Sequence, residues 1–264
     1  MDRIVSDIGQ LARDIGPREA TSASYRRAAS FVEQRLERLG YRVRRTSVPV
    51  PAGNSWGVPV RAGRSVNVIA EPAGFDPRLP HVVVGAHLDT VPQAPGAEDN
   101  ASGVAVLLEL ARLSSRQPPV LPVKFVTFGA EEPRGAGDAL HHFGSRREVA
   151  SLKATERRAV RAMVSLDRVG VAASYGPVCT ATSGARDLQQ DVRRAGSSID
   201  VPTRACSNQT SDHWSYVRAG IDGVRVGGVA YAGYHSPGDV PSVVSRRQLD
   251  RVGRLVLAWL RSLD

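Results

Sequence analysis

The sequence predicts a single α/β domain covering residues 1–264. Short apolar runs of strand length alternate with amphipathic stretches of helix length, and no internal repeat, low-complexity tract or linker divides the chain. With 264 residues, 42% of them hydrophobic, the chain is long enough to bury a large core. We therefore expect one layered unit rather than two small domains.

The expected elements follow from hydrophobic spacing. Phe31, Val32 and Leu36 recur at helical spacing, and Gly40 then ends that helix. The expected helices are residues 2–14, 22–39, 101–116 and 245–263. The expected strands are the extended segments 41–50 and 65–74, joined by a hairpin-like or loop connection at 51–64, and the short apolar runs 81–86, 123–130, 161–167 and 223–228.

The basic composition does not predict a nucleic-acid partner. The net charge is +9, but the arginines are spread along the chain and several fall on helical faces. No basic strand interleaved with aromatic residues accompanies them. No apolar stretch approaches the roughly 20 residues of a membrane span. We therefore expect neither nucleic acid nor membrane as a partner.

The N-terminus and the two cysteines bear on the compartment. The first 16 residues carry charges throughout and do not resemble a signal peptide, which favours the cytoplasm. Cys179 and Cys206 are too few for a multi-bridge framework or a four-cysteine zinc site. Whether they pair is left open, although two separate reduced thiols are the expectation for a cytosolic protein.

Polar residues follow the predicted buried strands. His87 and Asp89 come after the strand at 81–86, Glu131 and Glu132 directly follow the run at 123–130, and Asp167 ends the run at 161–167. In open α/β sheets the ligand crevice lies outside the carboxyl ends of the strands, so these side chains should converge there. Imidazoles and carboxylates are the ligands suited to zinc and its neighbours.

The spacing of these residues suggests separate tasks. Asp89 lies two residues after His87, on the same face of an extended backbone, and could hold the imidazole in position. Asp99 precedes a predicted helix, where it could be a cap or a metal bridge. Adjacent Glu131 and Glu132 would repel each other unless a cation or proton compensates, so one could bind metal while the other acts as general base.

Several strings resemble the M28 family of zinc aminopeptidases. They are GAEDNASGVAVLLELAR, FVTFGAEE, VSLDRVG and YHSPGDV, together with SDHWSYVRAGIDGVRV before a predicted strand. With the His87 segment, the resemblance spans residues 81–239. It implies the zinc-exopeptidase fold, a three-layer α/β/α sandwich with a mixed, mostly parallel central sheet.

The resemblance also implies a ligand set for two zinc ions per chain. Asp99 would bridge the two metals, with His87 and Asp167 on one and Glu132 and His235 on the other.

The implied activity is that of a zinc-dependent exopeptidase, an aminopeptidase that hydrolyses the N-terminal peptide or amide bond. Glu131 would be the general base toward a water bridging the metals. Tyr234 resembles a position that hydrogen-bonds the oxyanion in some relatives. The substrate would be a peptide or small amide, and neither the residue preference nor the oligomeric state can be inferred from the sequence.

The sequence departs from the family pattern near the site. Glu98 stands where relatives commonly have a second aspartate, and residues 133–143 replace a glycine-rich pattern. His141 and His142 in that segment are expected on a helix surface, His213 is expected as a supporting or core residue, and His81 is expected to be exposed.

Two other functions share parts of the pattern. AHLDTVP at 86–92 also resembles the M20 metallopeptidases and amidohydrolases, but the stretch between Asp167 and His235 is too short for their inserted dimerisation domain. A glutaminyl-cyclase-like acyl transferase would use one zinc, whereas the retained His87 and Asp99 favour two. Degenerate peptidase-like domains of receptors have lost ligands or the base, and here none is lost.

Overall fold

The computed structural model of the protein describes residues 1–181 and 186–263, and within these ranges one eight-stranded sheet forms the centre of the molecule. Its strands lie in the order β1-β4-β6-β5-β7-β10-β8-β9, and β2 and β3 form a separate hairpin. The strand bounds are β1 (Arg42–Val50), β2 (Gly53–Ser55), β3 (Val58–Val60), β4 (Gly63–Glu71), β5 (His81–His87), β6 (Val123–Phe128), β7 (Val160–Leu166), β8 (Gly176–Thr180), β9 (Thr203–Ser207) and β10 (Gly223–Val226).

The sheet is mixed and mostly parallel. The four central strands β6, β5, β7 and β10 are parallel neighbours. β1 and β4 extend the sheet on one side through antiparallel pairing. On the other side β8 pairs antiparallel with β10, and β9 pairs parallel with β8. The carboxyl ends of the four central strands therefore lie at one edge of the sheet, as the sequence predicted.

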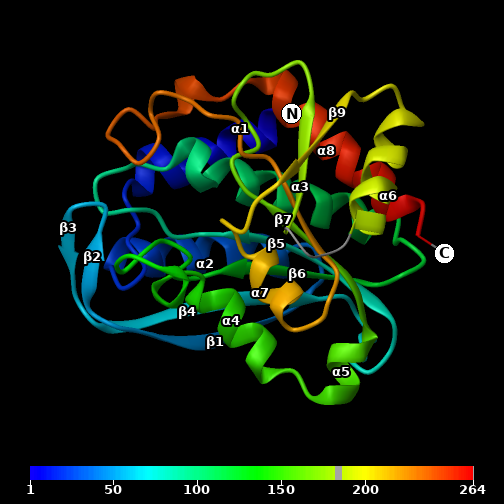
Figure 1. Ribbon diagram of the computed structural model, residues 1–264, viewed down its shortest axis with the longest axis horizontal. Helices are drawn as coiled ribbons and strands as arrows, with labels where there is room; N and C mark the ends of the chain where they lie inside the picture. Colours follow the sequence, from blue (N-terminus) through cyan, green and yellow to red (C-terminus); the bar gives the residue numbers. More distant parts are fainter. Residues whose placement is uncertain (182–185, 264) are drawn as a thin grey trace.

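Helices cover both faces of the sheet. Their bounds are α1 (Asp2–Ile8), α2 (Ala23–Glu37), α3 (Gly103–Arg116), α4 (Phe143–Ser151), α5 (Ala154–Ala159), α6 (Arg186–Ser197), α7 (His213–Arg218) and α8 (Arg246–Arg261), with short π- or 3-10-helical turns η1 (Gly9–Ile15), η2 (Ala97–Ser102), η3 (Asp138–Leu140) and η4 (Pro241–Val243). Val82 and Val84 of β5 pack in a large core with α1, α2, α3, α6 and α8, whereas Val83 packs in a smaller core with α4 and α7. Figure 1 shows α3, α6 and α8 grouped apart from α4 and α7. The predicted three-layer α/β/α sandwich is confirmed.

Most predicted elements form within a few residues of the expected bounds. The first helix continues to Ile15 through η1, and the second begins after Ser22, whose hydroxyl accepts the backbone N–H of Tyr25 at 3.0 Å. The connection at 51–64 contains the β2–β3 hairpin. The short elements β8, β9 and α4 to α7 were not anticipated. Among the described helices, none is long and apolar enough to cross a membrane.

A disulfide joins Cys179 of β8 to Cys206 of β9, so the expectation of two separate thiols is wrong. The two residues are register partners on neighbouring parallel strands. The sequence could not reveal this because neither strand was recognised. Cys179 is also the register partner of Arg225 on β10, which places the disulfide beside a buried arginine.

Candidate metal centre

The site residues predicted from the sequence meet at the carboxyl edge of the central strands. His87 is the last residue of β5, Asp167 follows β7, and the glutamate pair lies three and four residues beyond β6. Asp99 lies in the η2 turn and His235 in the connection between β10 and η4. All six side chains are buried, with His235 and Glu131 the most exposed at 8%.

The carboxylate of Asp99 lies between two imidazoles. Its Oδ1 is 3.0 Å from Nε2 of His87, and its Oδ2 is 3.2 Å from Nε2 of His235. Asp167 Oδ1 lies 3.9 Å from the same His87 nitrogen, and Glu132 Oε2 lies 3.3 Å from the His235 nitrogen. Three groups of candidate ligands result, and the ligand atoms of each lie within 4.8 Å of one another. Two of them share Asp99, one with His87 and Asp167 and one with Glu132 and His235, and the third consists of His87, Glu131 and Glu132.

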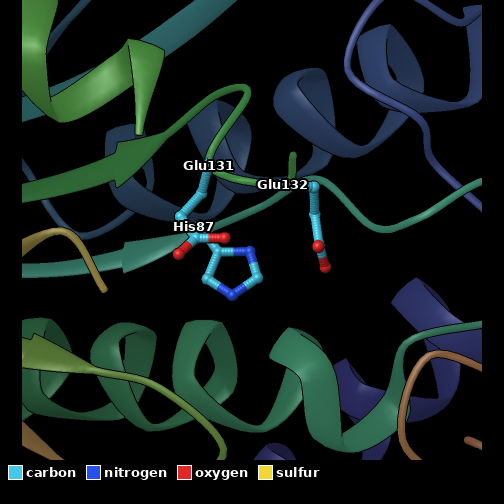
Figure 2. A group of neighbouring side chains, drawn as sticks. All are labelled: His87, Glu131 and Glu132. Carbon is cyan, nitrogen blue, oxygen red and sulfur yellow. The ribbon is translucent and has the colours of Figure 1, made fainter. Parts of the chain in front are cut away.

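The glutamate pair approaches His87 from the end of the neighbouring strand. Figure 2 shows the carboxylate of Glu131 beside the His87 ring and Glu132 extending past the other side of it. Glu132 Oε1 and His235 Nδ1 are buried and have no hydrogen-bond partner among the described residues. Buried carboxylate oxygens and imidazole nitrogens that make no hydrogen bond are available as ligands to a divalent cation, so the residues fit zinc.

Asp89 supports the glutamate pair rather than the His87 ring. Its two carboxylate oxygens accept the backbone N–H groups of Glu131 and Glu132, at 3.0 and 3.1 Å. Nδ1 of His87 contacts the backbone carbonyl of Asp89 at 3.2 Å, while the nearest carboxylate oxygen is 3.8 Å away. The predicted contact between carboxylate and imidazole is therefore replaced by one to the carbonyl, which leaves Nε2 facing Asp99.

A second buried aspartate holds the Asp99 turn in the same way. The Asp239 carboxylate accepts the backbone N–H of Glu98 at 2.8 Å and that of Asp99 at 3.0 Å. Glu98, the departure from the family pattern, is itself buried and accepts the backbone N–H groups of Gly170 and Val171 after β7. The longer glutamate thus ties the Asp99 turn to the end of the neighbouring strand.

The protonation of the cluster follows from burial and crowding of charge. Burial alone would lower the pKa of His87, but the negative charges of Glu131 and Asp99 outweigh it and raise the pKa well above its usual value. Burial acts to raise the pKa of Asp99, but hydrogen bonds from His235 and His87 hold it well below the usual range. Without a metal the imidazoles therefore carry protons that a cation would displace.

Comparison with known families places these residues in context. A family model described as Peptidase family M28 matches residues 67–260, which is most of the chain. The chain belongs to peptidase family M28.

This M28 chain is similar in sequence to aminopeptidases and similar in fold to zinc aminopeptidases and a glutaminyl cyclase. It is 33% identical over 187 residues to Aminopeptidase YwaD of Bacillus subtilis, a match that covers 67% of this chain but only 40% of that protein. Its fold is similar to that of BSAP, a zinc aminopeptidase from Bacillus subtilis, with a TM-score of 0.84 at 21% identity, covering 98% of this chain and 93% of that one. Bacteroides thetaiotaomicron glutaminyl cyclase gives 0.82 at 21% identity, covering 100% and 98%. The fold is thus shared by both enzyme classes.

Sequence reasoning missed a buried arginine in this M28 site. Arg225 of β10 is 2% exposed, and its Nη2 lies 3.0 Å from Oδ1 of Asp167. Its Nη1 donates to the Thr210 hydroxyl at 3.0 Å. The available signal was a single charged residue inside the apolar run GVRVGG, since a charge in a buried strand requires a partner.

The expectations for the other histidines are partly wrong. His142 is buried, not on a helix surface, and its Nε2 lies 3.2 Å from Oε1 of Glu131. His141 is half-buried, as part of the cavity lining. His81 is 1% exposed, contrary to expectation, and its Nδ1 lies 2.8 Å from the Leu79 carbonyl oxygen. His213 is buried as expected, with Nε2 3.0 Å from the carbonyl oxygen of Asn208.

A cavity of about 360 Å³ opens over the cluster. Its mouth is aromatic: Trp56, in the β2–β3 turn, is 55% exposed with its ring centroid 4.4 Å from that of His235, and Tyr234 stacks on the same imidazole at 3.7 Å. Arg168 and Arg225 also line the cavity. It is therefore acidic at the floor, aromatic at the mouth and basic on the wall beside Asp167.

Proposed function

We propose that this chain is a zinc-dependent exopeptidase, an aminopeptidase that hydrolyses the N-terminal peptide or amide bond of a peptide or small amide. The observation that carries the proposal is the position of Asp99, whose two oxygens lie 3.0 and 3.2 Å from the Nε2 atoms of His87 and His235. A carboxylate so placed can bridge two cations. Family membership and the aminopeptidase relatives support the same activity.

The proposed centre binds two zinc ions per chain. Asp99 would bridge them, His87 and Asp167 would hold one, and Glu132 and His235 the other. Each ion would have an imidazole and two carboxylates, which leaves room for substrate and water, as catalytic zinc sites do. When bound, zinc would polarise the scissile carbonyl and make water more acidic.

Glu131 is the proposed general base. It lies in the cavity, and the two ligand groups that share Asp99 are complete without it, although it forms a third possible group with His87 and Glu132. It would accept a proton from the attacking water at a carboxylate oxygen and deliver it to the leaving amine. Asp89 fixes its backbone, which positions this carboxylate. The hydroxyl of Tyr234 would donate to the developing oxyanion.

Zinc content and kinetics test the proposal together. We expect about two zinc ions per wild-type chain and turnover of aminoacyl anilides. Glu131→Gln should keep its zinc and lose about three orders of magnitude in kcat, because the amide cannot take up the proton. Asp99→Asn should lower the zinc content instead. A chain that binds no zinc under any loading condition, or a Glu131→Gln variant as active as wild type, would rule out the mechanism.

The same measurements distinguish the alternatives. A single zinc per chain with cyclisation of an N-terminal glutamine would support the glutaminyl-cyclase-like transferase, which shares the fold. The M20-like reading requires an inserted domain before His235, whereas the described residues after β7 form β8, α6, β9, α7 and β10 of the sandwich itself.

A further inference from the structure

The wall of the cavity beside Asp167 carries a guanidinium that has no hydrogen-bond acceptor among the described residues. Arg168 follows Asp167 at the end of β7 with φ of 55°, a left-handed conformation uncommon outside glycine. Its backbone N–H donates to Asn100 Oδ1 at 3.2 Å. Its side chain is 16% exposed and lines the cavity over the metal cluster.

Arg168 is not needed to neutralise Asp167. The nearest carboxylate oxygen, Asp167 Oδ1, is 3.8 Å from Arg168 Nε, beyond hydrogen-bond distance. Arg225 already donates to the same oxygen at 3.0 Å. Within residues 1–181 and 186–263, the guanidinium of Arg168 donates no hydrogen bond to a side chain or to the backbone.

The aromatic mouth holds Arg168 in place. Its guanidinium carbon lies 4.4 Å from the centroid of the Tyr234 ring, a cation–π contact, and Tyr234 in turn stacks on His235. A planar donor fork held beside the cluster is suited to a planar carboxylate, which it can bind through two parallel hydrogen bonds.

The ion pairs on this wall favour an anionic substrate. Arg225 is paired with Asp167 through a hydrogen bond of 3.0 Å, whereas Arg168 is 3.8 Å from the same carboxylate. Among the described residues that line the cavity, Arg168 is therefore the guanidinium free to bind a carboxylate brought in by the substrate. Taking a neutral substrate into this wall would leave the donors of Arg168 without an acceptor inside a half-enclosed cavity.

We propose that Arg168, with Arg225 behind it, binds a carboxylate of the substrate next to the scissile amide, so that the enzyme prefers acidic substrates. This inference rests on the proposed function and adds its substrate class. The carboxylate can be the side chain of an N-terminal glutamate or aspartate, or the free C-terminus of a dipeptide. Both present the same group to Arg168.

Binding to the zinc-loaded protein tests the inference without requiring turnover. In the first arm, calorimetry compares L-glutamate with L-glutamine, which differ only in the side-chain carboxylate. In the second, Glu131→Gln protein is titrated with leucyl-glycine and leucyl-glycinamide, which differ only in the C-terminal carboxylate. We expect the acid to bind about tenfold or more tightly in one of the two arms.

Variants assign that preference to Arg168. Arg168→Met should abolish the difference, and Arg168→Lys should keep part of it, because the charge remains without the planar fork. Arg13→Gln, which removes an exposed arginine paired with Asp14, is the matched control and should keep the preference. Equal binding of acid and neutral partner in both arms, or a preference that survives in Arg168→Met, would overturn the inference.

Turnover separates this inference from the proposed function. Hydrolysis of neutral anilides with no preference for a carboxylate would leave the function intact and refute the role of Arg168. An Arg168-dependent preference in a protein that binds zinc but hydrolyses no anilide would support the carboxylate site and refute the aminopeptidase activity.

Discussion

His142 lies directly behind the proposed general base, with its Nε2 3.2 Å from Oε1 of Glu131. Burial lowers the pKa of His142, so the ring is neutral near pH 7 and has one N–H to donate. Among the described residues, His87 is the other imidazole close to this carboxylate, with which it forms one of the candidate ligand groups. The contact does not have hydrogen-bond geometry at Nε2, so the imidazole limits the space open to the Glu131 carboxylate without adding a formal charge beside it.

Removal of this contact should slow the reaction and leave metal binding intact. We expect His142→Phe to lower kcat by about tenfold or more, because the Glu131 carboxylate loses the group that orients it. His142→Gln, which keeps a polar group beside the carboxylate, should retain more activity. Steady-state kinetics at matched zinc content measures both variants. Wild-type kcat in His142→Phe would show that the contact does not position the base.

The Asp89 clamp should contribute to stability even without metal. Its carboxylate accepts two backbone N–H groups, so Asp89→Asn leaves one of them facing an amide NH₂ group in a buried site. We expect the free energy of unfolding of the metal-free protein to fall by about 2 to 4 kcal/mol in a denaturant titration.

A surface variant provides the matched control for the clamp. Asp14→Asn changes an aspartate in an exposed pair with Arg13 and should shift stability by less than about 1 kcal/mol. Equal effects of the two substitutions would mean that the Asp89 hydrogen bonds are not a significant source of stability.

The sequence was sufficient to predict the position of site residues that directly follow strands. It was insufficient to predict the position of those that reach the site from longer connections. His87, Glu131 and Asp167 could be placed because each ends or follows an apolar run, and parallel strands bring such positions together. The contacts of Asp239 could not be predicted from the sequence, because this residue reaches the Asp99 turn only through the folding of the connection after β10. The structure thus adds supporting residues around a predicted cluster.

Two local features explain the remaining errors. His142 has φ of 56° and precedes α4, so the helical face assumed from the sequence does not apply to it. β9 is largely exposed and has no apolar run, and β8 begins with a Gly-Pro pair, so neither had the pattern of a buried strand. The disulfide between them was hidden for the same reason.

Opening the Cys179–Cys206 bond should destabilise the protein. The bond closes a loop with a sequence separation of 27, and constraint of an unfolded chain by such a loop contributes about 3 to 4 kcal/mol in the chain-entropy treatment. The Cys179→Ala/Cys206→Ala variant should therefore unfold at lower denaturant concentration than the oxidised wild type.

Reduced wild-type protein provides the control for the double variant. Wild-type protein reduced before unfolding should match the double variant, and an unchanged midpoint in both would contradict the prediction.

Thiol titration of the isolated protein bears on the compartment. Disulfides persist in oxidising compartments and are rare in the cytosol. Two reactive thiols in the protein as isolated from its native cells would agree with the cytoplasmic expectation, and none would oppose it.

His213 should make the protein sensitive to mild acid. Burial lowers its pKa to about 4, whereas an unfolded chain titrates near 6.5. Between these values the unfolded state binds more protons than the folded state, so the free energy of unfolding falls as the pH falls through this window. The loss attributable to His213 should reach about 3 kcal/mol near pH 4 and vanish above pH 7.

A variant isolates this contribution from those of the other histidines. His213→Gln can still donate to the Asn208 carbonyl, which His213 Nε2 contacts at 3.0 Å, but does not titrate. In metal-free protein, lowering the pH from 7 to 4 should therefore reduce the free energy of unfolding of the wild type more than that of the variant. Parallel pH profiles would show that His213 accepts a proton in the folded protein as readily as in the unfolded chain. The buried environment around α7 would then have to be more open to water than its packing against β7 and β10 indicates.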